Sequence, residues 1–459
     1  MSEIADRDGL PVPHRYWAIL TIALGLVLAV LNGAIANVAL PVIARDLHTD
    51  PATSIWVVNA FQLAVTVSLL PLASLGDIHG YRQVYRWGLV VFTVASVLCA
   101  LSTTLPLLII ARVAQGIGAA GIMSVNGALI RFIYPRRSLG QAVGLNATIG
   151  SVASAAGPLV ASAVLSFEPW PWLFAVNVPL GIVACLIAWR ALPDTPHSGA
   201  RFDVAGALLQ AVSFGTLLIG ISEIGHGDST FHVVLDLVVG LVTGGVLVAR
   251  MMTERAPLLP VDLLRIPIFA LSVATSVCSF ISQSMMQVTM PFLLQHDLGM
   301  DLVMTGLLMT PWPLTVAVVA PLAGRLADKY PAGLLGGCGM VVMAVGTAAM
   351  AMLPAQAGWL DIAWRMTVCG IGFGFFNTPN NRAIITSAPA SRSGGASGMQ
   401  ATSRLFGQTT GAALVALLFG AMPDGGTTWA LLLAAGAAGV AAIVSFSRMA
   451  TRKGQGGGG

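Results

Sequence analysis

Charged residues are scarce in this sequence. Only 9% of its 459 residues are Asp, Glu, Lys or Arg, whereas 56% are hydrophobic. A soluble domain carries about a quarter of its residues as charges, so this composition excludes a protein whose whole surface faces water. Mean hydropathy is +0.83. Long apolar runs recur along the chain, which indicates an integral membrane protein surrounded by lipid.

Several kinds of site are also missing from the sequence. It has no GxxxxGK[ST] loop, no metal-ligand cluster and no spaced Ser/His/Asp set. We therefore expect neither an enzyme nor a cofactor. The net charge of +4 comes without a basic stripe and interleaved aromatic residues, which argues against nucleic acid as a partner. The five cysteines lie in apolar runs without paired spacing and are interpreted as structural thiols. The first apolar run is too long for a signal-peptide core, so no cleaved signal is expected.

The apolar runs predict an all-α polytopic membrane protein with fourteen transmembrane helices, since a bilayer core takes about 20 helical residues. The runs are too long and too continuously apolar for the strands of a barrel. The predicted spans are 17–40, 53–75, 83–102, 105–130, 139–166, 170–191, 203–223, 232–251, 267–293, 303–326, 333–353, 360–386, 396–421 and 427–447.

The basic residues predict the orientation of these spans. If the N-terminus is cytoplasmic, 19 of the 23 Lys and Arg residues fall in cytoplasmic loops and tails, and only Arg45 lies in an outer loop. The positive-inside rule then places both termini in the cytoplasm. Lysine is rare relative to arginine, which is typical of a GC-rich bacterial genome. The expected location is the bacterial inner (plasma) membrane.

A long-period repeat runs through the chain. Similar segments recur in the same order, with prolines 250 positions apart in two pairs and arginines 253 positions apart in a third. The pairs are NVALP (37–41) with QVTMP (287–291), LPLASLGD (70–77) with APLAGRLAD (320–328), and RVAQGIGAAG (112–121) with RMTVCGIGFG (365–374). This order predicts two pseudo-symmetric six-helix bundles, as transporters often contain. The expected domains are 1–192, an inserted helix pair in 193–260, and 261–459.

With these motifs, the sequence resembles the major facilitator superfamily, and in particular its fourteen-helix drug:proton antiporter branch. LASLGDIHGYR (72–82) is similar to the family motif between helices 2 and 3, although Tyr81 departs from it. RVAQGIGAAG resembles the fourth-helix motif, GSVASAAGPLVAS (150–162) the antiporter motif of helix 5, and LNGAIANVALP (31–41) the first-helix motif. The matching residues outside the fourth helix are Asp77, Gly80, Arg82, Gly157 and Pro158.

These motifs predict parts of a gate. Asp77 can accept hydrogen bonds from backbone N–H groups at a helix start or pair with an arginine, and Asp328 is its second copy. Such a lock suits a switch between inward- and outward-open states; the alternative is a solvated loop charge. Gly157 and Pro158 cost a backbone hydrogen bond and bend their helix. Packing and hinge roles are both open there, and we favour packing with some gating.

Three arginines lie within predicted spans, where a charge is costly and a functional role is the default. For Arg112 the resemblance implies a role in proton transfer or in the coupling network. Arg365 is closer to the outer surface and can snorkel to it. For Arg404 functional and structural roles are equally open.

Polar and aromatic residues recur at helical spacing on several spans. As a set they predict a central substrate cavity walled by amides, aromatic rings and methionines. Amides that join neighbouring membrane helices are the alternative for any single residue. The candidate substrate-binding residues are Asn32, Trp56, Asn59, Gln62, Gln283, Met286, Gln287, Asn377 and Arg404.

The first span contains two asparagines five residues apart, hence about 140° apart around the helix. We assign Asn32 to the cavity and Asn37 to a neighbouring helix, with the reverse left open. Members of the resembled branch often carry an acid where Asn32 stands, and no carboxylate lies near the middle of any predicted span. Because an amide cannot titrate, a cavity with arginines and no acid favours anionic or neutral substrates over dications.

Three functions follow from the sequence. The first is a monomeric secondary active exporter of amphipathic drugs or biocides that is driven by the proton gradient, with protons, a small-molecule substrate and the lipid bilayer as partners. Antibiotic resistance would be its consequence. The second is a specific carrier of an anionic or neutral metabolite without a membrane carboxylate for proton coupling. The third is a membrane sensor or scaffold that does not transport.

Overall fold

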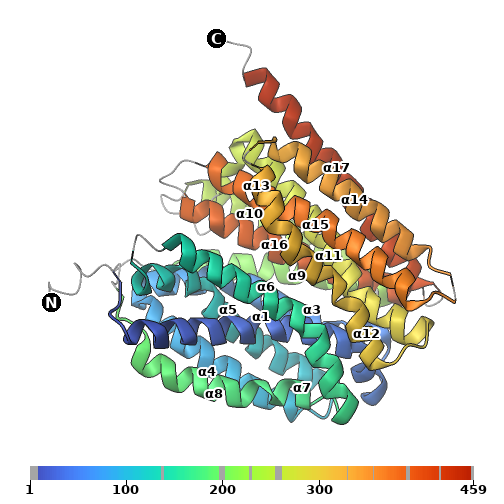
Figure 1. Cartoon of the computed structure of the whole chain (residues 1–459), viewed down its shortest axis with the longest axis horizontal. Helices are drawn as coiled ribbons and strands as arrows, with labels where there is room; N and C mark the ends of the chain where they lie inside the picture. Colours follow the sequence, from blue (N-terminus) through green and yellow to red (C-terminus); the bar gives the residue numbers. More distant parts are fainter. Residues whose placement is uncertain are drawn as a thin grey trace. The chain divides into compact units, whose positions relative to one another are not determined.

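The computed structural model describes residues 9–135, 139–195, 202–226, 230–253, 261–327, 329–354, 356–388, 393–422 and 425–455. Over these ranges the chain forms helices joined by short turns and contains no strand, as the ribbon shows from its blue N-terminal helix to its red C-terminal helix (Figure 1). The prediction of an all-α protein is confirmed.

Fourteen long helical segments are present in the described chain, as predicted. Some of them are built from two consecutive helices, such as α2 with α3 and α12 with α13. The helices are α1 (His14–Asp46), α2 (Pro51–Ser54), α3 (Trp56–His79), α4 (Tyr81–Ala100), α5 (Leu105–Ile133), α6 (Leu139–Phe167), α7 (Trp172–Ala175), α8 (Asn177–Ala191), α9 (Val204–His226), α10 (Thr230–Thr253), α11 (Pro267–Phe292), α12 (Leu302–Met309), α13 (Pro311–Leu326), α14 (Ala332–Ala351), α15 (Trp359–Ser387), α16 (Ser393–Ala421) and α17 (Gly426–Gln455). Two short irregular turns, η2 (Val261–Arg265) and the π-helical η3 (Leu293–Asp297), flank α11.

Thirteen of these segments are long and apolar enough to cross a membrane. Among the described long helices, α15 falls short of that composition although it has 29 residues. It carries Asp361, Arg365 and Arg382 together with a group of asparagines. Its polar side chains therefore need partners in the protein, since lipid offers none.

Contacts between Cα atoms divide the chain into two compact units. Unit 1 contains Met1–Ala36 and Ala60–Leu208, and unit 2 contains Asn37–Asn59 and Leu209–Gly459. The helices α1, α3 and α9 thus each contribute residues to both units. The expected domain limits at residues 192 and 260 stay a prediction.

In unit 1, glycine allows α5 to touch the backbone of α3. A methyl group added at Gly116 would lie 2.5 Å from the carbonyl oxygen of Phe61 and 2.7 Å from Cβ of Ala64. Only a residue without a side chain permits such an approach, which is how membrane helices gain close packing.

Unit 2 contains the same contact between α15 and α13. A methyl group at Gly370 would lie 2.7 Å from the carbonyl oxygen of Trp312 and 3.0 Å from Cβ of Thr315. Gly370 follows Gly116 by 254 positions and Trp312 follows Phe61 by 251. These separations match the sequence repeat, so the repeat extends to the packing of its helices.

Candidate functional site

Arg112 lies in the third turn of α5 and is fully buried within unit 1. Its Nη1 donates hydrogen bonds to Gln115 Oε1 at 2.7 Å and to Asn32 Oδ1 at 3.2 Å. The guanidinium carbon lies 4.2 Å from the ring centre of Phe61 and 5.5 Å from that of Phe174. Amide oxygens and the faces of two aromatic rings thus stabilise the charge by hydrogen bonds and cation–π attraction.

Gln115 extends this network toward α4. Its Nε2 donates to Ser96 Oγ at 2.9 Å, and its Oε1 lies 3.6 Å from the thiol sulfur of Cys99. Ser96, Cys99 and Gln115 are all fully buried. The arginine network therefore joins α1, α4 and α5 through four side-chain hydrogen bonds.

The predicted gate residue Asp77 is exposed and lies in the last turn of α3. Its carboxylate accepts a hydrogen bond from the Tyr81 hydroxyl at 2.5 Å, and no ion pair with an arginine is found for it in the described chain. The expectation of a backbone cap at a helix start is wrong, because α3 continues through Asp77 to His79. The turn to α4 comes at Gly80, whose φ of +95° suits glycine.

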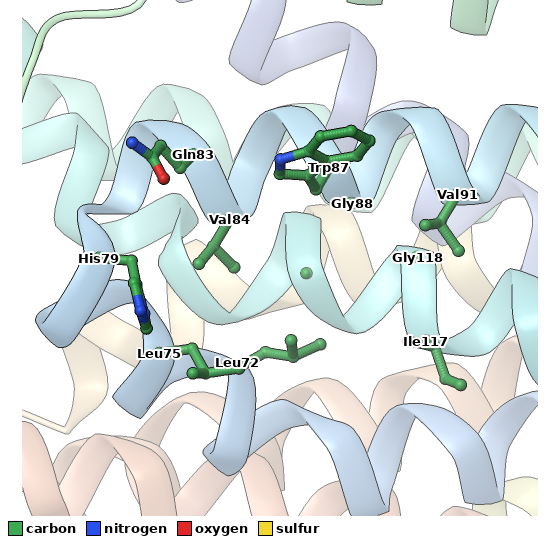
Figure 2. A pocket seen from close by; sticks show the side chains of 11 residues that line it. Leu72, Leu75, His79, Gln83, Val84, Trp87, Gly88, Val91, Ile117 and Gly118 are labelled. Carbon is green, nitrogen blue, oxygen red and sulfur yellow. The ribbon is translucent and has the colours of Figure 1, made fainter. Parts of the chain in front are cut away.

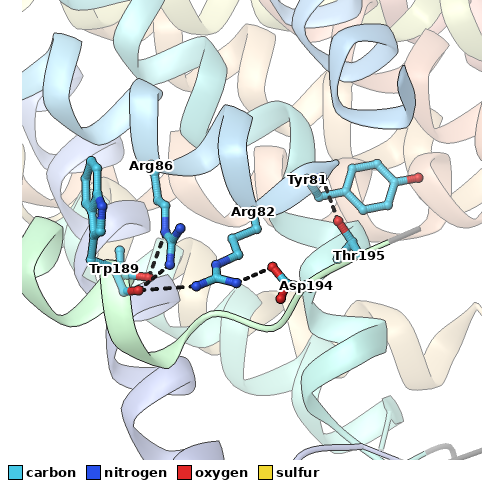
Figure 3. A network of polar contacts seen from close by, with 7 residues as sticks. Tyr81, Arg82, Arg86, Trp189, Asp194 and Thr195 are labelled. Carbon is cyan, nitrogen blue, oxygen red and sulfur yellow. Dashed lines mark hydrogen bonds and ion pairs between the residues drawn. The ribbon is translucent and has the colours of Figure 1, made fainter. Parts of the chain in front are cut away.

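Arg82 and Arg86 at the start of α4 bind the end of α8 (Figure 3). Arg82 forms an ion pair with Asp194 and donates to the carbonyl oxygen of Trp189 at 3.3 Å. Arg86 donates to the carbonyl oxygens of Ala188, at 3.1 Å, and of Trp189. These carbonyls belong to the last turn of a helix, which has no N–H partners of its own and is stabilised by positive charge.

Asp194 is a partner that sequence reasoning missed. It lies 112 positions from Arg82, and nothing in its neighbourhood marks it as a member of the loop motif. Its only signal is its place just after a predicted span, in a loop predicted to be cytoplasmic, where most charges are basic.

Gly157 and Pro158 lie within α6, where both are buried. A methyl group at Gly157 would lie 2.3 Å from Cβ of Ala34 in α1. Gly411 of α16 repeats this contact in unit 2, with Cβ of Ser284 at 2.9 Å. The geometry therefore places Gly157 in close helix packing. Asp328 lies outside the described residues.

The predicted substrate-binding residues are divided between the two units. Asn32 and Gln62 belong to unit 1, and the others to unit 2. Within unit 2, Asn377 accepts a hydrogen bond from Asn381 at 3.1 Å, and the sulfur of Met286 lies 3.8 Å from the Thr347 hydroxyl. Asn59 and Met286 are buried, whereas the remaining unit 2 members are half-buried: Trp56, Gln283, Gln287, Asn377 and Arg404. Their role in substrate binding stays a prediction.

An apolar cavity of about 250 Å³ lies between α3, α4 and α5 (Figure 2). Leu72, Leu75 and Ile117 line it with Trp87, and His79 lies at its edge. None of the predicted substrate-binding residues lines this cavity. Its walls carry few polar groups, so its chemistry alone selects no substrate.

Arg448 is a second buried arginine, although it follows the last residue of the predicted span 427–447. It lies inside α17, with 5% of its surface exposed. It donates to Asn380 Oδ1 at 2.7 Å, Ser272 Oγ at 3.0 Å and Ser445 Oγ at 2.5 Å. Three helices of unit 2 are thus joined at one guanidinium. Ser445 lies three residues before Arg448, a spacing that puts both on one helix face.

Comparison with known proteins identifies the family. The model of the Major Facilitator Superfamily matches residues 22–412 and 273–457. The chain belongs to the Major Facilitator Superfamily. Its relatives are transporters, so this multi-pass membrane protein is a member of a transporter family.

Three relatives indicate the range of this superfamily. The chain is 54% identical over 446 residues to "Uncharacterized transporter YebQ" of Escherichia coli, covering 97% of this chain and 98% of that one. It is 28% identical to "Riboflavin transporter RibZ" of Clostridioides difficile, covering 88% of each chain. It is 30% identical to "Multidrug resistance protein Stp" of Mycobacterium tuberculosis, covering 85% of this chain and 73% of the relative.

Proposed function

We propose that this superfamily member is a proton-driven exporter of small amphipathic compounds that works by alternating access. The multidrug resistance protein among its relatives supports export. The motifs of the fourteen-helix drug:proton antiporter branch support proton coupling. In this proposal the protein acts as a monomer in the bacterial inner membrane, with both termini in the cytoplasm, and contributes to antibiotic resistance.

The observation that carries the proposal is the state of Arg112. A guanidinium without exposed surface is held by amides and two rings within a membrane helix. Keeping a charge inside a membrane-spanning helix costs several kcal/mol, so a charged residue at such a position usually has a role in transport. A change in its surroundings, by a proton or by substrate, is then strongly felt because little water screens it.

The loop motif supports the gating part of the proposal. Asp77, Gly80 and Arg82 lie at one turn between α3 and α4, and Arg82 ties this turn to the end of α8. Movement of the turn is thereby transmitted to α8 within unit 1. Gly157 in α6 provides a close contact with α1, and Pro158 next to it lies inside α6, where a proline can bend the helix.

A second candidate is a carrier of one neutral or anionic compound. It is favoured by the absence of a carboxylate from the middle of the predicted spans and by the presence of Asn32 beside Arg112. The riboflavin transporter among the relatives is named for a neutral, carbonyl-rich substrate of this kind. For the substrate, amides and arginine offer hydrogen bonds but no negative charge.

The two candidates are separated by uptake into inverted membrane vesicles under an imposed pH gradient. The panel contains dyes, biocides, riboflavin and organic anions. Arg112→Ala is compared with Arg365→Ala, the matching position of the repeat. The expected loss of gradient-driven uptake for Arg112→Ala is about ten- to a hundredfold, as for one charge-assisted hydrogen bond of 1.5–3 kcal/mol. Unchanged uptake in Arg112→Ala would remove Arg112 from coupling, and uptake of one compound without a pH gradient would favour the second candidate.

A further inference from the structure

The hydrogen bonds around Arg112 have a defined direction that begins at Ser96. The Ser96 hydroxyl has one hydrogen, which it donates to the carbonyl oxygen of Phe92 at 2.7 Å. Its oxygen is then an acceptor, and it accepts from Gln115 Nε2 at 2.9 Å. Ser96 therefore requires the nitrogen, and not the oxygen, of the Gln115 amide at its own position.

The direction continues through the arginine. With its nitrogen bound to Ser96, Gln115 turns its oxygen toward Arg112 Nη1, 2.7 Å away. A guanidinium only donates, so Arg112 also requires an oxygen from Asn32, and Oδ1 accepts at 3.2 Å. The orientation of both amides is thus determined by chemistry.

The last atom in this series is Asn32 Nδ2. Because Oδ1 faces Arg112, the amide presents its two N–H groups on the other side. Asn32 is fully buried, and its Nδ2 has no hydrogen-bond partner among the described residues. Buried donors in native proteins are satisfied by protein, water or ligand. A donor held in place by three upstream residues and left without an acceptor points to a ligand that supplies one.

We propose that Asn32 Nδ2 donates a hydrogen bond to an acceptor on the transported molecule, a carbonyl or anionic oxygen, and that Ser96 and Gln115 are positioning residues for this donor. The proposal rests on the proposed transport function and adds the chemical class of the group recognised. Cations that carry only donors meet an N–H group here and are disfavoured. In the proposed alternating-access cycle, the donor meets the substrate in a state in which Asn32 is exposed.

Cys99 allows the direction of the series to be measured without transport. Its thiol lies 3.6 Å from Gln115 Oε1, so its S–H stretching band reports whether that oxygen faces it. The four other cysteines are replaced by alanine in the full-length protein. Ser96→Ala should broaden the band and shift it toward the position of a free thiol, because Gln115 Nε2 loses its acceptor and the amide is then restrained only through its oxygen. Ser96→Thr keeps a hydroxyl and should keep the band. An unmoved band in Ser96→Ala would overturn the role of Ser96.

Recognition of the acceptor is tested with two probes, riboflavin, which has ring carbonyls, and ethidium, a cation with amino donors. Binding to purified protein and uptake into inverted vesicles are measured for the wild type, Asn32→Leu and the isosteric Asn32→Asp. The affinity and the uptake rate for riboflavin, each divided by the value for ethidium, should fall about tenfold in both variants. This change is equivalent to one hydrogen bond of about 1.4 kcal/mol. Ser96→Ala should also lower this riboflavin-to-ethidium ratio.

The outcomes separate this proposal from the function on which it rests. If Arg112→Ala loses gradient-driven uptake while both Asn32 variants keep the riboflavin-to-ethidium ratio, the role of Asn32 as a donor to the substrate is rejected and the exporter function stands. If the Asn32 variants change the ratio while Arg112→Ala keeps full gradient-driven uptake, the role of Arg112 in coupling is rejected and the role of Asn32 as a donor stands. Binding of neither probe by the wild-type protein would overturn the assigned class of acceptor.

Discussion

The contact between α5 and α3 predicts a specific sensitivity to added volume at Gly116. A methyl group there would lie 2.5 Å from the carbonyl oxygen of Phe61. Carbon and carbonyl oxygen atoms approach to about 3.3 Å at closest in well-packed proteins. The overlap is therefore about 0.8 Å, and a carbonyl within α3 cannot turn away from it. In Gly116→Ala the two helices must separate or the variant must unfold more easily.

Gly127 provides the matched control on the same helix. A methyl group at Gly127 would meet nothing within 4 Å. Both substitutions gain the same helix propensity, about 1 kcal/mol, so this gain cancels in their difference. Overpacking of a tight contact costs about 1–3 kcal/mol, and we expect Gly116→Ala to be less stable than Gly127→Ala by that amount.

The measurement is equilibrium unfolding of the full-length variants in mixed detergent micelles, with intrinsic fluorescence as the signal. Gly370→Ala extends it to unit 2, where the corresponding contact of 2.7 Å is slightly longer and the loss should be slightly smaller. Equal stability of Gly116→Ala and Gly127→Ala would refute the close approach of α5 to α3. A loss of stability in Gly116→Ala without a loss in Gly370→Ala would refute the repetition of the contact in unit 2.

Other substitutions test the remaining polar contacts. Asp77→Asn should abolish vesicle uptake without lowering the folded yield, and full uptake in this variant would argue against the gate. Tyr81→Phe removes the hydrogen bond of 2.5 Å to Asp77 and should weaken uptake if that bond contributes to gating. Asp194→Asn should change the free energy of unfolding by no more than about 1 kcal/mol, as for an exposed ion pair. Arg86→Met removes the side-chain donor from the Ala188 carbonyl oxygen, while Arg82 still donates to that of Trp189, and it should cost about 1–3 kcal/mol in the same unfolding measurement. Arg448→Met should cost at least as much as Arg86→Met because it strands buried acceptors on two other helices, and a smaller loss would contradict that role.

The spans were predictable because lipid imposes a simple rule on sequence. A helix in the membrane satisfies its own backbone, so its length and apolar composition are visible without knowledge of its neighbours. The predicted span 105–130 corresponds to Leu105–Ile133, and 267–293 corresponds to Pro267–Phe292 followed by η3. The ends differ where an interfacial turn continues the helix.

The partners of the polar residues were less predictable. Asp194 reaches Arg82 only because α4 and α8 are neighbours, a fact with no local trace in the sequence. Asp77 was expected to accept hydrogen bonds at a helix start or to pair with an arginine, but α3 ends after it and Tyr81 supplies its hydrogen bond. The predicted last span ended at residue 447, one position before Arg448, whereas α17 extends beyond it. In each case the surroundings of the charged side chain depend on residues that lie near it only in the folded chain.

The two arginines of the repeated motif show how a duplicated scaffold becomes functionally asymmetric. Arg112 has no exposed surface and depends on Asn32 and Gln115, which are neutral. Arg365, its counterpart, pairs with Asp361 one turn earlier at 2.8 Å and keeps 14% of its side chain exposed. The carboxylate of Asp361 compensates the charge of Arg365, so that charge has less effect on other groups. The helix contacts are present in both units, whereas the two arginines of the repeated motif differ in their partners, amides for Arg112 and a carboxylate for Arg365. This difference supports the proposal that Arg112, and not Arg365, takes part in coupling.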